Sequence, residues 1–178
     1  MKVSKTPALK NSIIATCVPA NYSDVFTAGI EKKYHISPDE LQIAFWTDMP
    51  GWVNSLFKLR NWIVKPFGLK AGTKNFDEFK NAIKTGTNYK FFSISGKSEN
   101  EMVILLTDKH LNVYLSVFIA DVNTDFQKVY VSTVVHFNNW LGYAYFYTIL
   151  PFHCIVVKGT IKHALKKLKK QKSLTVPV

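Results

Sequence analysis

Residues 101–137, EMVILLTDKHLNVYLSVFIADVNTDFQKVYVSTVVHF, decide the fold of this chain. Apolar side chains recur at every second position through 101–107, 111–120 and 128–137, and polar turn residues separate these runs. A period of two is typical of β-strands, and connections this short join antiparallel neighbours. Together with a fourth run at 88–95, the stretch predicts a four-stranded antiparallel meander.

The two faces of this predicted sheet differ in composition. Along 111–120 one face is purely aliphatic, whereas the other carries Tyr114 and Phe118 among small polar side chains. Tyr130 and His136 extend that second face on 128–137. Such a sheet is covered on both sides or curls around an amphipathic interior. The pattern leaves open a ligand pocket and a core that tolerates polar groups.

Helices are predicted before and after the meander in the sequence. Ser37 and Glu40 are spaced to form a capping box, with Pro38 at the first helical position. A break at 48–51 precedes a second helix over 51–66, ended by Pro66 and Gly68, and a short helix follows at 76–83. Upstream, 13–18 predicts a first strand, and 21–35 an edge strand or a loop.

The C-terminal part predicts one long helix. It begins after Asn138-Asn139 and runs to about Lys170, with a kink or division at Pro151, and the tail 171–178 is expected to be loose. This element order predicts an α+β protein with one domain over 1–170. The order is that of the helix-grip architecture, in which a curved antiparallel sheet wraps the long C-terminal helix and leaves a cavity between them.

The positive charge is concentrated at the C-terminus. Lys and Arg number 23 against 12 Asp and Glu, Arg60 is the only arginine, and the last acidic residue is Asp125. Lysines alone attract polyanions without reading bases, so no specific nucleic acid is expected. The first interpretation is a solvated helix end, and the alternatives are weak contact with an anionic membrane or nucleic acid. The lysines concerned are Lys158, Lys162, Lys166, Lys167, Lys169 and Lys170.

An uncharged stretch at 129–157 raises the question of a membrane span. Its first part alternates like a strand, and its second part is rich in polar and tyrosyl groups that would insert poorly into a bilayer. A cytoplasmic protein is therefore predicted. Cys17 and Cys154 cannot build a disulfide framework, and no motif for a metal or a cofactor is visible.

Four residues are candidates for acid–base chemistry. Asp108 and His110 flank a tight turn, where both residue types also occur for structural reasons. His136 and His153 would be able to meet across a cavity, although such histidines are more often buried with one hydrogen bond satisfied. The candidate ligand-lining residues are Tyr114, Phe118, Tyr130, His136, Tyr145 and His153.

Several strings resemble a bacterial family catalogued as domain of unknown function 2867. They are LRN at 59–61, GLK at 68–70, DKHL at 108–111, LSV at 115–117, TVVH at 133–136, NxxLGxxY at 138–145 and PFH at 151–153. The family is similar to the START-like, helix-grip superfamily. The resemblance implies a cavity for apolar ligands without an established activity.

Three functions are therefore carried forward. The leading hypothesis is a non-enzymatic domain that binds a hydrophobic or amphipathic small molecule between the sheet and the last helix. The second is a cyclase- or isomerase-type enzyme that uses His136 or His153 together with Asp108 or His110. The third is a basic surface module that contacts an anionic membrane or nucleic acid.

Overall fold

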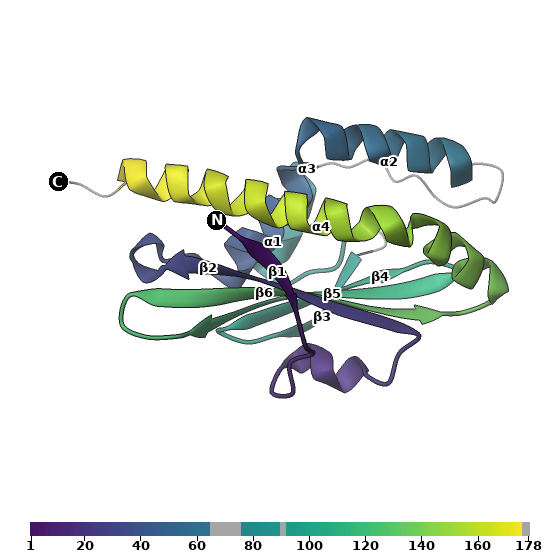
Figure 1. Ribbon diagram of the computed structural model, residues 1–178, viewed down its shortest axis with the longest axis horizontal. Coiled ribbons are helices and arrows are strands. Elements are labelled where there is room, and N and C mark those ends of the chain that lie inside the picture. Colours follow the sequence, from purple (N-terminus) through teal and green to yellow (C-terminus); the bar gives the residue numbers. More distant parts are fainter. Residues whose placement is uncertain (65–75, 90–91, 176–178) are drawn as a thin grey trace.

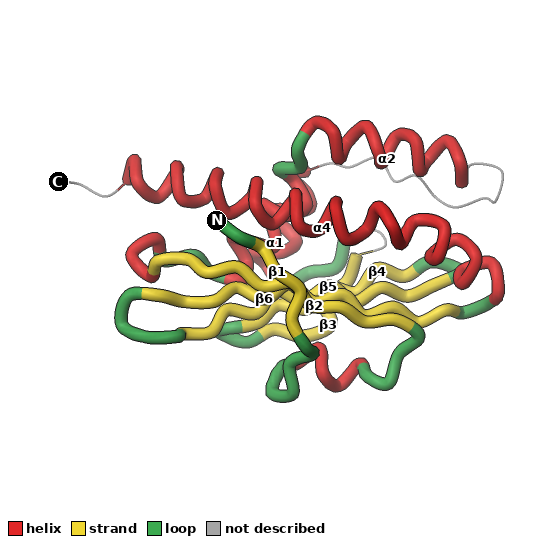
Figure 2. Tube along the Cα trace, in the orientation of Figure 1, coloured by secondary structure: helices red, strands yellow, loops and turns green. Residues whose placement is uncertain are grey.

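A computed structural model describes residues 1–64, 76–89 and 92–175. Its centre is a six-stranded antiparallel sheet in the order β1-β2-β6-β5-β4-β3, with the α-helices on one side and a short 3-10 helix on the other (Figures 1 and 2). The strands are β1 Val3–Thr6, β2 Tyr22–Glu31, β3 Phe92–Lys97, β4 Glu101–Thr107, β5 Leu111–Asp121 and β6 Phe126–Phe137. The predicted meander is confirmed as β3 to β6, although β3 begins at Phe92 and positions 90–91 lie outside the described residues.

The first part of the chain departs from the prediction. Residues 13–18 are not a strand, because Ile13–Cys17 form the short 3-10 helix η1. The amides of Ile13 and Ile14 donate to the buried carboxylate of Glu101, which fixes them away from any strand ladder. The segment predicted as an edge strand or a loop is instead β2, which pairs with β1 on one side and β6 on the other.

Three helices follow β2 and the short 3-10 helix η2 (Lys32–Tyr34). α1 (Pro38–Thr47) has the predicted capping box: Glu40 N donates to Ser37 Oγ over 3.2 Å, and Ser37 N donates to Glu40 Oε2 over 3.0 Å. α2 spans Gly51–Val64 and α3 spans Phe76–Thr85. The predicted end of the second helix at Pro66 and Gly68 lies outside the described residues.

The last helix, α4 (Trp140–Thr175), crosses the whole sheet (Figure 1). Pro151 lies inside this helix and does not divide it, while the first turns of α4 run at an angle to the remainder (Figure 1). α4 ends five residues beyond the predicted Lys170, because an ion pair from Lys172 to Glu40 holds its last turns against α1.

The main core lies between the sheet and the helices α1 and α4. It is built from Phe26, Ala28 and Ile30 of β2, the aliphatic faces of β5 and β6, and the stripe Val157, Ile161, Ala164, Leu165 and Leu168 of α4. α2 lies farther out, where Trp52 packs on Gly159 of α4. An α+β protein with an antiparallel sheet under a long C-terminal helix is compatible with the helix-grip fold.

Candidate functional site

The structure divides the predicted ligand-lining residues between two sides of the sheet. Odd-numbered residues of β5 and β6 face α4, since Val117 and Val131 belong to the core beneath that helix. Tyr114, Phe118 and His136 therefore lie on the opposite face. Tyr130 lies there too, with its ring 5.9 Å from that of Phe118.

The segment around η1 covers part of this opposite face. Ile14 packs against Val134 and Tyr114, and His136 Nε2 lies 2.9 Å from the carbonyl oxygen of Cys17. Figure 1 shows η1 and α4 on opposite sides of the sheet. The prediction that His136 meets His153 across one cavity is wrong, because strand alternation turns His136 away from the helix that carries His153.

Asp108 and His110 hold the start of α4. Asp108 Oδ1 accepts a hydrogen bond from His110 N over 3.2 Å, which closes the turn between β4 and β5. Asn138 and Asn139 bind the same turn: Asn138 N donates to His110 O over 2.9 Å, and Asn139 Nδ2 donates to Lys109 O over 3.2 Å. These contacts fit the interpretation of Asp108 and His110 as turn residues. They connect the pair to neither His136 nor His153.

His153 instead meets an acidic residue that the sequence analysis did not single out. Its Nε2 lies 3.1 Å from Asp24 Oδ2, and the hydroxyl of Tyr22 donates to the same oxygen over 2.7 Å. The Asp24 side chain is 0% exposed, and that of His153 is 15% exposed. Asp24 was detectable in principle, because the alternation of Phe26, Ala28 and Ile30 places it on the buried face of the same strand.

Aromatic rings surround this cluster, which we call the Asp24 cluster (Tyr22, Asp24 and His153). The Tyr22 ring centroid lies 4.7 Å from that of Phe146 and 6.0 Å from that of His153. Burial, helped by the hydrogen bond to Asp24, raises the pKa of Tyr22 well above its ordinary value. Tyr22 therefore keeps its proton and remains a donor to the carboxylate.

Several buried polar atoms on the α4 side of the sheet lack a hydrogen-bond partner within the described part of the chain. Asp24 Oδ1 is one, and Thr133 Oγ1 is another. Thr133 is the direct cross-strand neighbour of Asp24, so their side chains stand side by side. Gln42 Nε2 donates to Leu115 O over 3.1 Å, while Gln42 Oε1 is unpaired. Leu115 is the cross-strand neighbour of Thr133, so Gln42 meets the sheet one strand beyond Thr133.

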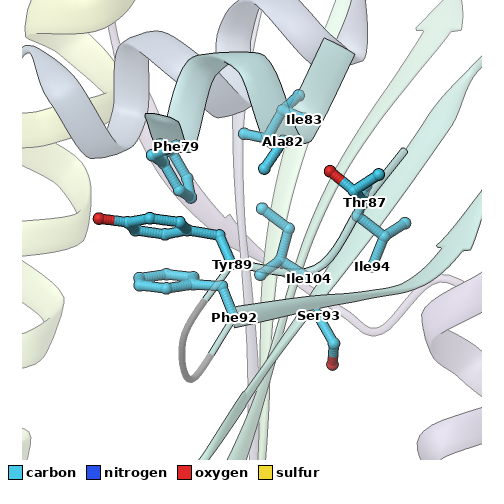
Figure 3. A pocket seen from close by; sticks show the side chains of 9 residues that line it. All are labelled: Phe79, Ala82, Ile83, Thr87, Tyr89, Phe92, Ser93, Ile94 and Ile104. Atoms are coloured by element: carbon cyan, nitrogen blue, oxygen red, sulfur yellow. The ribbon is translucent and has the colours of Figure 1, made fainter. Parts of the chain in front are cut away.

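A small pocket lies elsewhere, between α3 and the strands β3 and β4 (Figure 3). Its volume is about 10 Å³, enough for about one water molecule and far below the size of a ligand site. None of the predicted site residues lines it. It is lined by Phe79, Ala82, Ile83, Thr87, Tyr89, Phe92, Ser93, Ile94 and Ile104.

Comparison with known proteins agrees with the resemblance seen in the sequence. Residues 18–160 match the family described as "Protein of unknown function (DUF2867)". The chain belongs to this family. No curated protein and no solved structure matches it. The family match extends from before β2 into the middle of α4, so it contains the complete Asp24 cluster.

Proposed function

We propose that this domain is a cytoplasmic binding protein for an amphipathic small molecule, whose polar group binds at the Asp24 cluster. The observation that carries the proposal is the open Oδ1 of a carboxylate whose side chain is fully buried. A carboxylate accepts several hydrogen bonds, and leaving part of that capacity unused away from water is costly. A ligand that donates a hydrogen bond would remove this cost.

The chemistry of the cluster defines the polar group of the ligand. Asp24 Oδ2 is occupied by Tyr22 and His153, so Oδ1 is the position open to a new donor. The neighbouring Thr133 hydroxyl adds a second unpaired group that either donates or accepts. A hydroxyl or an ammonium group suits this arrangement, whereas a carboxylate or a phosphate would meet a like charge at Asp24.

The apolar part of the ligand is assigned to the first half of α4 and the strands beneath it. Phe146 is buried there, and Tyr145, Ile149 and Leu150 are only partly buried around it. Half-buried aromatic and aliphatic side chains beside a few polar groups are typical of small-molecule sites. Of the six predicted lining residues, Tyr145 and His153 belong to this site. The resemblance to helix-grip proteins supports a ligand on this side of the sheet.

Access to the site would require movement of the first turns of α4. Asp24 is closed to solvent, and the part of α4 before Pro151 covers the neighbouring Tyr22 through Phe146. A proline inside a helix removes one backbone hydrogen bond and weakens the helix locally. The helix can therefore pivot at Pro151 while its C-terminal part stays packed on the core.

Native mass spectrometry of the purified chain, followed by organic extraction, tests this proposal. We expect an extra mass of a few hundred daltons on the wild-type protein, as fits a site of this kind. Asp24→Asn should lose it. Glu101→Gln is the matched control, because Glu101 is also a buried carboxylate and lies on the opposite face of the sheet. Retention of the extra mass by Asp24→Asn would contradict the proposed position.

Proton transfer by His153 is a second candidate function. Asp24 contacts one ring nitrogen of His153, and a carboxylate in that position orients a histidine for acid–base work. The predicted alternative partners, Asp108 and His110, are engaged at the start of α4. If an extracted ligand is converted over time, His153→Gln should stop the conversion and retain the ligand; unchanged turnover would exclude this role.

A further inference from the structure

We propose that the outer face of α4 binds the surface of an anionic lipid bilayer. This inference goes beyond ligand binding and does not depend on it. The outer face is the side of α4 that points away from the sheet. Its residues are Trp140, Phe152, Ile155, Lys162, Lys166 and Lys170, all of which are exposed.

The first half of this face is apolar. Trp140 is 78% exposed, Ile155 is 58% exposed and Phe152 is 52% exposed. Trp52 of α2, which packs on Gly159, is exposed as well. Helix α4 is long and apolar enough to cross a membrane, yet only 17% of its most apolar window is buried in the protein. Large apolar side chains that gather on an exposed surface mark an interaction site, and Trp52 of α2 lies over Gly159 between Ile155 and Lys162.

The second half of the outer face is basic. Lys158, Lys162, Lys166 and Lys170 recur every fourth residue along the helix, and the Lys158 ammonium lies 5.5 Å from the centroid of the Phe26 ring. The last three make no ion pair within the described part of the chain. The other lysines of this region have partners at the flanks of the helix: Lys167 pairs with Asp48, Lys169 with Glu31 and Lys172 with Glu40.

The combination favours a bilayer surface over nucleic acid. An exposed Trp side chain is suited to the boundary between lipid headgroups and acyl chains, and a helix with one apolar and one basic exposed region adsorbs to anionic lipid. No acidic residue follows Asp125, so nothing on α4 repels such a surface. Insertion across the bilayer is disfavoured, because Val157, Ile161 and Leu165 of the same helix pack on the sheet.

Vesicle co-sedimentation of the full chain tests this inference, using phosphatidylcholine vesicles with and without phosphatidylserine. We expect binding only when phosphatidylserine is present and release at high salt. Each lysine near an anionic surface strengthens binding about fivefold. The triple variant Lys162→Gln/Lys166→Gln/Lys170→Gln should therefore bind on the order of 100-fold more weakly. The matched control is Lys10→Gln/Lys84→Gln/Lys128→Gln, which removes three exposed lysines elsewhere.

The apolar half is tested separately. Phe152→Ser/Ile155→Ser changes two exposed side chains, so the protein should remain folded and bind phosphatidylserine vesicles more weakly. A blue shift of tryptophan emission on adding vesicles should be smaller in Trp140→Phe than in the wild-type protein. The inference would be overturned by no binding to phosphatidylserine vesicles, by an equal loss in both triple variants, or by binding that resists high salt. A protein that binds duplex DNA but not vesicles, and whose Phe152→Ser/Ile155→Ser variant binds DNA as tightly as the wild type, would overturn it in favour of a polyanion site.

Discussion

His153 Nε2 lies 3.1 Å from Asp24 Oδ2, which joins the last helix to the second strand of the sheet across 129 positions of sequence. The Asp24 side chain is completely buried, yet its second oxygen has no partner within the described part of the chain. Buried charged groups are normally paired and fully hydrogen-bonded. The unpaired Oδ1 beside His153 is the observation on which the proposed ligand site rests.

Tyr22 should make the stability of the protein sensitive to alkaline pH. Its folded-state pKa is raised above the ordinary value of 10 by burial and by Asp24, so the folded protein keeps a proton that the unfolded chain loses. The free energy of unfolding should therefore fall as the pH rises above 10. Urea unfolding at a series of pH values should show this fall, and Tyr22→Phe should reduce it. An identical pH dependence in Tyr22→Phe would contradict the assignment.

Glu101 should anchor the N-terminal segment to the sheet. Its carboxylate accepts from the amides of Ile13 and Ile14 and, over 2.6 Å, from the hydroxyl of Ser116. Glu101→Ala leaves these donors unsatisfied and should lower the free energy of unfolding by about 3 kcal/mol, with faster amide exchange in η1. Glu99→Ala, which removes an exposed carboxylate nearby, should have little effect. Equal losses in the two variants would rule out the anchor.

Gly142 should be required for the contact between α4 and the turn before β5. A Cβ at this position would collide with the backbone carbonyl of His110, which cannot move aside easily. Gly142→Ala should lower the free energy of unfolding by about 2 kcal/mol, although alanine favours helices. At Gly29 a Cβ would meet nothing within 4 Å, so Gly29→Ala is the control. A higher free energy of unfolding in Gly142→Ala would contradict the close contact between Gly142 and the His110 carbonyl.

Local patterns predicted the regular elements well. The alternation in 101–137 fixed the meander, and the Ser37–Glu40 spacing identified the start of α1. The N-terminal segment was wrong because Ile13 and Ile14 bind Glu101, a partner almost ninety positions away that no local pattern reveals. The long-range pairing of β1 with β2 was missed for the same reason.

The candidate site was predicted only in part. His153 and Tyr145 were identified as site residues, but their proposed partners were chosen from the aromatic-plus-polar face of β5 and β6. That face points away from α4, and η1 covers part of it, so its polar groups do not meet α4. Asp24 was missed because the segment around it was interpreted as an edge strand or a loop, where an aspartate would be exposed. Recognising β2 as an inner strand would have placed that carboxylate beneath α4.

The proposed role of Asp24 is tested with two fluorescent probes of equal chain length, a fatty amine and a fatty acid, each labelled at the far end. If Asp24 receives the polar group, the wild-type protein should bind the amine at least about tenfold more tightly than the acid. Asp24→Asn should bind the two probes about equally, and Glu101→Gln should keep the wild-type preference. Equal binding of both probes by the wild-type protein, or an unchanged preference in Asp24→Asn, would contradict the role of Asp24 as the acceptor of the polar group.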